Sequence, residues 1–121
     1  MSRILVAEDD VHIAEMIVFT LTRAGHEVVH AADGGQAVLA LDESSFDLVL
    51  LDLMMPVMSG LELLRGLKAD RSRMGIPVVI LSARSREKDV ELGRAAGAVD
   101  YLTKPFSLSE LVTRVERALQ S

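Results

Sequence analysis

The chain has 121 residues, of which half are hydrophobic, so it is long enough for one compact domain with its own core and too short for two. Its formal net charge of −5 argues against direct nucleic-acid binding, which needs clustered Lys and Arg, and the lack of cysteine excludes disulfides and thiolate chemistry. The apolar runs are shorter than a membrane span, and no secretory signal pattern opens the chain. We therefore expect one domain over residues 1–121 in a cytoplasmic protein without membrane contact.

Five short segments have the character of β-strands. Ile4–Ala7, Leu48–Leu51 and Val78–Leu81 are continuously apolar, which is typical of strands buried on both faces of a parallel sheet. Glu27–Ala31 and Val99–Leu102 are more mixed and suit the edges of that sheet.

A helical pattern follows each strand. Asp10, Asp33 and Ser107 are placed to cap the first, second and last helices. The fourth helix, Glu87–Ala96, has no clear apolar stripe and contains Gly93, so it is predicted to be the least stable. The alternation of strands and helices predicts an α/β fold, a doubly wound parallel sheet of five strands with five helices. The apolar helix positions are Ile13, Ile17, Leu21 and Ala24, then Ala37, Val38 and Leu41, then Leu61, Leu64 and Leu67, and finally Leu108, Leu111, Val112, Val115 and Leu119.

Acidic and polar residues stand where the strands end. Glu8 and Asp9 follow the first strand, Asp52 the third, Ser82 the fourth and Lys104 the fifth. Carboxyl ends of parallel strands share one edge of the sheet, so these side chains should meet in one crevice. Carboxylates without His or Cys favour a hard cation such as Mg²⁺, with Asp9 and Asp52 as direct ligands and Glu8 acting through water. A carboxylate beside Mg²⁺, a lysine and a hydroxyl is suited to accepting a phosphoryl group.

Five segments together make the chain resemble the receiver domain of two-component response regulators from end to end. They are Ile4–Asp10, Asp47–Pro56, Ser59–Gly60, Val79–Ala83 and Asp100–Phe106. The resemblance implies a flavodoxin-like sheet with strand order 2-1-3-4-5.

The same resemblance implies a role for each site residue. Asp52 is the phosphoacceptor, Glu8 and Asp9 are the acidic Mg²⁺ pair, and the backbone carbonyl of Met54 is a further metal ligand. Ser82 bonds the phosphoryl group, and Lys104, whose peptide bond to Pro105 is expected to be cis, pairs with it. Ser82 and Tyr101 are the switch residues, and Tyr101 changes rotamer. The phosphoryl donor would be a histidine on a kinase or phosphotransfer protein, and the output partner is not named by the sequence.

Two alternatives to a stand-alone signalling switch stay open. The chain is equally consistent with the N-terminal receiver of a larger DNA-binding response regulator. A Mg²⁺-dependent phosphohydrolase that uses Asp52 as its nucleophile is the other alternative. Such enzymes often carry a second acid two residues later, where this chain has Met54, and the sequence has no room for a cap domain. We therefore expect a switch and not an enzyme.

The remaining charged and imidazole side chains are interpreted as structural. His12, His26 and His30 lack metal-ligand spacing and are expected to be structural or exposed, and Arg71 and Arg73 are expected in a solvated loop.

The segments Ala83–Arg84 and Tyr101–Ser107 most resemble those of receivers in transcription factors, which often dimerise on phosphorylation through charge pairs. This chain keeps Asp100, Glu110 and Arg114 but has Val90 and Val99 where that class often has Arg and Asp. We expect both valines to be exposed, and the protein to be a monomer that dimerises at most weakly when phosphorylated.

Overall fold

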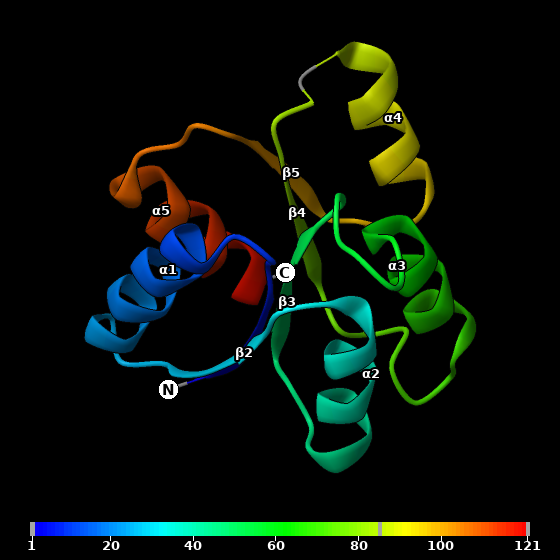
Figure 1. Ribbon diagram of the computed structural model, residues 1–121, viewed down its shortest axis with the longest axis horizontal. Helices are drawn as coiled ribbons and strands as arrows, with labels where there is room; N and C mark the ends of the chain where they lie inside the picture. The colour runs from blue at the N-terminus through cyan, green and yellow to red at the C-terminus, as the bar shows by residue number, and fades with distance from the viewer. Residues whose placement is uncertain (1, 85, 121) are drawn as a thin grey trace.

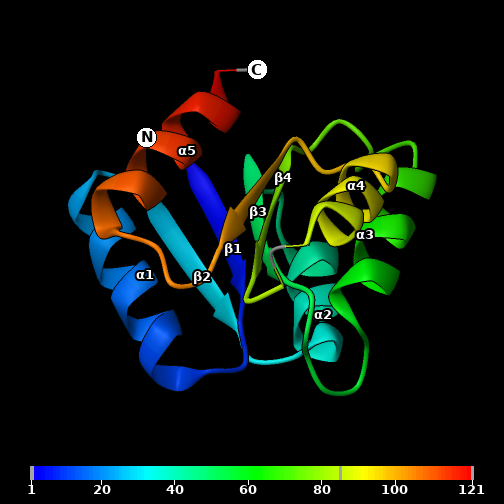
Figure 2. The same ribbon diagram turned by 90° about the horizontal axis from the view of Figure 1, so that it is seen from above.

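The computed structural model describes residues 2–84 and 86–120, and within them the chain forms one parallel sheet flanked by helices (Figures 1 and 2). The strand order is β2-β1-β3-β4-β5, which confirms the predicted doubly wound, flavodoxin-like topology. The strands are β1 (Arg3–Ala7), β2 (Glu27–Ala31), β3 (Leu48–Asp52), β4 (Val78–Ser82) and β5 (Asp100–Thr103). The helices are α1 (Val11–Arg23), α2 (Gly34–Glu43), α3 (Gly60–Ala69), α4 (Glu87–Ala95) and α5 (Leu108–Leu119).

The sheet is covered on both faces, as its continuous apolar strands require. Figure 2 shows α1 and α5 on one face and α2, α3 and α4 on the other. Ile4 and Val6 of β1 pack toward the α1–α5 face, whereas the alternate residues Leu5 and Ala7 pack toward α2 and α3. β1, β3 and β4 are therefore almost entirely buried, while β2 and β5 form the edges.

The predicted helix caps are present. The Asp10 carboxylate accepts from the backbone N–H groups of His12 and Ile13, and the Asp33 carboxylate accepts from Gln36. The Ser107 hydroxyl oxygen accepts from the backbone N–H of Glu110 in the same way. Each cap satisfies amide donors that have no partner inside the helix, and so fixes where the chain enters it.

Helix α4 is the least embedded helix, in agreement with its weak apolar pattern. Gly93 is its one buried residue among those described, and its N-cap, Arg86, makes no side-chain capping bond. Gly93 has a packing reason, since a Cβ there would lie 2.7 Å from Cδ1 of Ile80. The expectation that Val90 and Val99 are both exposed was wrong in part: Val90 is half-buried against the core, and only Val99 is exposed.

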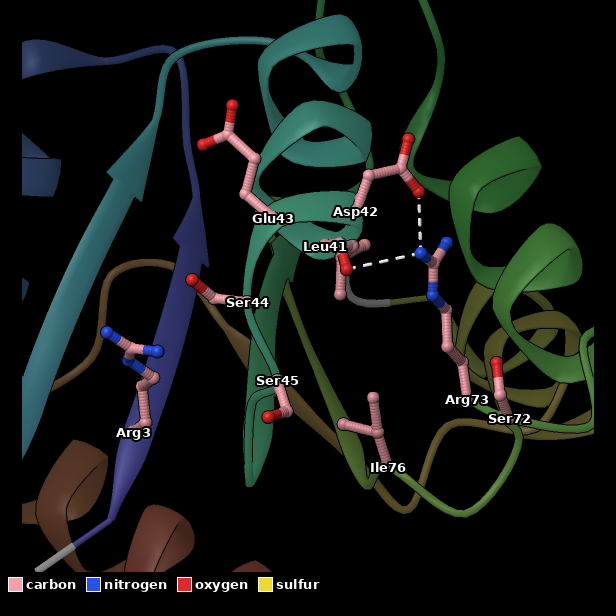
Figure 3. Close-up of a pocket in the computed structure, with 9 residues that line it drawn as sticks. All are labelled: Arg3, Leu41, Asp42, Glu43, Ser44, Ser45, Ser72, Arg73 and Ile76. Carbon is pink, nitrogen blue, oxygen red and sulfur yellow. Dashed lines mark hydrogen bonds and ion pairs between the residues drawn. The ribbon is translucent and has the colours of Figure 1, made fainter.

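The expectation of a solvated loop was wrong for Arg73. Its guanidinium donates to the carbonyl oxygen of Leu41 at 3.1 Å and to the carboxylate of Asp42 at 2.6 Å. It thereby ties the loop after α3 to the end of α2 (Figure 3). Arg71 is exposed, as expected.

No helix among the described residues combines the length and the apolar character needed to cross a lipid bilayer.

Candidate functional site

The predicted acidic residues meet at the carboxyl edge of the sheet. Asp52 is the last residue of β3, and Glu8 and Asp9 follow β1. Carboxylate oxygens of these three residues all lie within 4.8 Å of one another. Glu8 and Asp52 are buried and Asp9 is exposed, so the cluster opens to solvent on the side of Asp9.

Lys104 reaches this cluster from the loop after β5. Its ammonium donates to Oε1 of Glu8 at 2.5 Å and lies 3.5 Å from Oδ2 of Asp52. The peptide bond between Lys104 and Pro105 is cis, as the resemblance implies. Burial works to lower the pKa of Lys104, but the hydrogen bond to Glu8 and the charges of Asp52 and Glu8 together raise it above its usual value.

The charge balance of the site favours a cation. Burial, followed by the hydrogen bond with the Glu8 side chain and the Glu8 charge, raises the pKa of Asp52 to about 7. The backbone N–H of Met54, which donates to Oδ1 of Asp52 at 3.1 Å, and the ammonium of Lys104 work in the opposite direction. Three carboxylates face one lysine here, and a divalent cation bound to their oxygens would relieve the repulsion between them.

Each polar group of Glu8 has a partner. Oε1 accepts from the Lys104 ammonium, and Oε2 accepts from the backbone N–H of Asp10 at 3.1 Å. The Glu8 backbone N–H donates to the carbonyl oxygen of Ala31 at 3.1 Å. The Glu8 carbonyl oxygen lies 2.8 Å from Nε2 of His30 on β2. This contact of His30 is not predictable from residue spacing, because it depends on the strand pairing that brings His30 beside Val6.

The other two histidines lie away from the acids. His26 pairs with Glu116 of α5 at 2.8 Å, which ties the start of β2 to α5, and His12 is exposed on α1. Both fit the structural or exposed interpretation.

Ser82, at the end of β4, and Tyr101, on the neighbouring strand β5, both contact one residue, Arg84. The buried Ser82 hydroxyl oxygen accepts from the backbone N–H of Arg84 at 3.1 Å. The Tyr101 hydroxyl donates to the carbonyl oxygen of Arg84 at 2.7 Å, and its ring is buried. The loop after β4 is therefore bonded to both predicted switch residues.

Gly60 seats α3 against the end of β3. A Cβ at this position would collide with the main-chain oxygen of Asp52, so only glycine allows the backbones to approach this closely. The Gly60 backbone N–H donates to the carbonyl oxygen of Leu53 at 3.1 Å. The loop that carries Met54 is thereby held between the strand and the helix.

A polar groove of about 510 Å³ lies at the opposite, amino edge of the strands (Figure 3). Its two arginines are occupied within the chain, Arg73 by Asp42 and Arg3 by Glu27. The groove does not adjoin the acids, so it offers no substrate pocket to Asp52.

The comparisons with known proteins agree with this geometry. The family model of the response regulator receiver domain matches residues 4–116. The chain belongs to the response regulator receiver family. It is accordingly the receiver domain of a two-component response regulator, and its family is one of signalling switches.

Among similar proteins, the DNA-binding response regulator MtrA of Mycobacterium tuberculosis is 46% identical over 118 residues, which are 98% of this chain and 50% of MtrA. The chain thus spans about half the length of the curated relative. A receiver domain from Francisella (response regulator 1452) superposes with a TM-score of 0.93 at 35% identity, covering 99% of this chain and 98% of that domain. The receiver domain of sensor histidine kinase PA1611 from Pseudomonas aeruginosa, solved with a magnesium ion in its active site cleft, gives a TM-score of 0.90 at 32% identity, with 99% and 98% covered.

Proposed function

We propose that Asp52 accepts a phosphoryl group from a histidine kinase or phosphotransfer protein, with Mg²⁺ at the acidic cluster, and that Ser82, Lys104 and Tyr101 convert this event into a change of the output face. The observation that carries the proposal is the position of Asp52. Its carboxylate ends a buried strand, beside two further acids and 3.5 Å from a lysine ammonium.

The cation would be held by oxygen atoms alone. Asp9 and Asp52 supply carboxylates, the backbone carbonyl of Met54 is the third protein ligand, and Glu8 acts through water. A donor set of oxygens suits Mg²⁺, and the surplus of negative charge around Asp52 supports a divalent ion. The magnesium ion in the similar PA1611 receiver is a further support. When bound, Mg²⁺ would neutralise charge that builds up on the phosphoryl oxygens.

The residues of this chain supply the nucleophile and its orientation. A carboxylate oxygen of Asp52 attacks the phosphorus of the donor phosphohistidine, the P–N bond breaks, and its electron pair stays on the imidazole nitrogen. The Met54 N–H on Oδ1 holds the Asp52 carboxylate in place for this attack. Lys104, already close to Oδ2, is placed to exchange its bond to Glu8 for one to a phosphoryl oxygen.

The switch would run through the loop after β4. The Ser82 hydroxyl has a proton to donate, and a phosphoryl oxygen on Asp52 is a stronger acceptor than any neutral group. Movement of Ser82 toward the phosphoryl group would break its bond from the Arg84 N–H, and Arg84 also accepts from Tyr101. A shift of this loop would therefore release the Tyr101 hydroxyl and free its ring to change rotamer.

We infer that the receiver domain of residues 1–121 belongs to a larger DNA-binding regulator acting in the cytoplasm. The supporting observation is that MtrA, a DNA-binding regulator, is about twice as long as the matched segment. The domain itself would contact neither DNA nor membrane, and would act as a switch. The phosphohydrolase alternative is not favoured, because apolar Met54 occupies the position of the second acid.

Phosphorylation with a small-molecule donor tests the proposal. Wild type and Asp52→Asn are incubated with acetyl phosphate and Mg²⁺, and intact-mass spectrometry counts phosphoryl groups. We expect one group on wild type, none on Asp52→Asn, and none when a chelator removes Mg²⁺. Equal labelling of Asp52→Asn would overturn the assignment of Asp52, and repeated turnover of donor would favour the phosphohydrolase.

Lys104→Ala separates phosphorylation from signalling. Because the ammonium is placed to pull the loop before α5, this variant should still accept a phosphoryl group but lose the NMR shift of Tyr101 that accompanies activation. A Tyr101 response equal to that of wild type would contradict the role of Lys104.

A further inference from the structure

The contact between His30 and Glu8 joins the edge strand to the acidic turn. Nε2 of His30 lies 2.8 Å from the main-chain carbonyl oxygen of Glu8. A carbonyl oxygen can only accept, so Nε2 carries the hydrogen and donates it. His30 is exposed on β2, and it lines a groove together with Ala14 and Val18 of α1.

The bonded carbonyl belongs to the peptide unit that joins Glu8 to Asp9. The orientation of this unit sets the direction in which the Asp9 side chain leaves the backbone. Within residues 2–84 and 86–120, the Asp9 carboxylate has no hydrogen-bond or ion-pair partner, and Asp9 is exposed. Nothing but the main chain therefore aims this carboxylate at the other two acids.

The other bonds of Glu8 do not fix the same peptide. Lys104 and the Asp10 N–H hold the Glu8 carboxylate, and the bond to Ala31 holds the amide that precedes Glu8. The His30 bond is the described contact that restrains the Glu8 carbonyl, and so the peptide before Asp9.

We propose that His30 is a positioning residue for the metal site: by holding the Glu8 carbonyl, it aims the Asp9 carboxylate at the cation. This inference rests on the proposed function, in which Asp9 and Asp52 bind Mg²⁺. The bond forms whether the ring is neutral with its hydrogen on Nε2 or fully protonated, so the role does not depend on the charge of the ring.

Three substitutions at this exposed position of an edge strand separate the hydrogen bond from the bulk of the ring. His30→Gln keeps an N–H donor at similar reach, whereas His30→Leu keeps volume without a donor. His30→Val, with a residue that strands favour, is a second variant without a donor. Mg²⁺ is titrated into wild type and each variant at one pH, and the NMR signal of the Asp9 amide, which shares its peptide with the Glu8 carbonyl, is followed.

We expect His30→Leu and His30→Val to bind Mg²⁺ about tenfold more weakly, as is typical when a group that orients a metal ligand is removed, and His30→Gln to bind close to wild type. In the metal-free proteins the Asp9 signal should move in the two variants without a donor and stay near its place in His30→Gln. Unchanged Mg²⁺ affinity in His30→Leu and His30→Val would overturn the positioning role of His30 and leave the proposed function intact. Equally weakened Mg²⁺ binding in all three variants would show that the hydrogen bond of His30 is not what supports Mg²⁺ binding. A wild type without saturable Mg²⁺ binding would overturn the proposed function and this inference with it.

Discussion

The ring of Tyr101 lies so close to Gly93 of α4 that a Cβ added at Gly93 would come within 3.2 Å of the ring carbon Cδ2. The same Cβ would lie 2.7 Å from Cδ1 of Ile80. In this position the Tyr101 hydroxyl reaches the carbonyl oxygen of Arg84. The backbone of α4 thus forms one wall of the site occupied by the predicted switch residue.

Gly93→Ala should destabilise the protein, although alanine is the better helix former. The helix propensity gain of about 1 kcal/mol is opposed by overpacking against Ile80 and Tyr101, which typically costs about 1–3 kcal/mol. We expect a net loss of about 1 kcal/mol in the free energy of unfolding, measured with urea. The NMR signals of Tyr101 should shift as its ring is displaced.

Gly66 offers a matched control, because it lies inside α3 and a Cβ there would meet nothing within 4 Å. Gly66→Ala should therefore stabilise by about 0.5–1 kcal/mol. Equal stabilisation by both alanines would show that α4 does not pack as closely on Tyr101 as described.

The pKa of Asp52 predicts how stability depends on pH in the absence of metal. In the unfolded chain the carboxyl titrates near its ordinary value of 3.8, and in the folded protein its pKa is about 7. Between these pH values the folded state holds a proton that the unfolded state has lost. The free energy of unfolding therefore falls as pH rises, and it stops falling above about pH 7, where Asp52 is ionised in both states. Urea unfolding in the presence of a chelator measures this dependence.

Asp52→Asn isolates the contribution of Asp52 to this pH dependence. The amide does not titrate, so the stability of the variant relative to wild type should increase between about pH 5 and about pH 8. A difference that stays constant over this range would contradict the raised pKa.

Val57 adopts a backbone conformation that valine disfavours. Its φ is 74°, in the left-handed region, and its side chain is 83% exposed in the loop between β3 and α3, so burial offsets little of the strain. Val57→Gly should stabilise the fold by about 1 kcal/mol, because glycine adopts this conformation without a steric penalty. Thermal unfolding would measure the gain.

Val57→Ala is the control, since alanine keeps the Cβ that clashes in this region. It should gain less than glycine. A destabilised Val57→Gly would indicate that the valine side chain contributes contacts that outweigh its strain.

We predict a long-lived phosphorylated form. The positions two residues after Asp52 and two after Ser82 flank the path of water to a phosphoryl group on Asp52, and they hold Met54 and Arg84. The Met54 side chain is apolar and Arg84 is bulky, so neither orients an attacking water. Met54→Asn introduces an amide and should accelerate the loss of the phosphoryl group about tenfold, followed by intact-mass spectrometry.

Wild-type dephosphorylation within seconds, without a phosphatase, would contradict this prediction. Met54→Leu is the control, since it keeps an apolar side chain and should leave the rate near that of wild type.

The fold and the acidic site were predictable because they depend on local signals. Continuous apolar strands place their ends at one edge, and an acid such as Asp52 at a strand end then has its position fixed by the sheet. Contacts between residues that are distant in the sequence were not predictable in this way. Arg73 bonds to α2, His30 bonds to Glu8, and Gly93 packs on Tyr101 only because the assembled fold brings these residues together.

The charged residues on α5 and β5 bear on dimerisation. The Asp100 carboxylate pairs with Arg114 at 2.7 Å and lies 3.7 Å from Arg94, and Arg114 lies 3.7 Å from Glu110, all within one chain. A dimer built on charge pairs would have to share or exchange these bonds, and exposed ion pairs contribute only about 0–1 kcal/mol each. We therefore expect a monomer without phosphorylation and at most a weak dimer with it, measured by sedimentation with and without beryllofluoride and Mg²⁺.

Arg114→Ala tests whether charge pairs determine any association. If the weak dimer rests on the exposed Val99, removal of the Arg114 guanidinium should leave the dimer in place. Added salt should not weaken it, because apolar contacts do not depend on charges that salt screens. A tight dimer on activation that dissociates in salt and is abolished by Arg114→Ala would contradict this prediction. Asp100 and Glu110 would then bind arginine across the interface more strongly than within the chain.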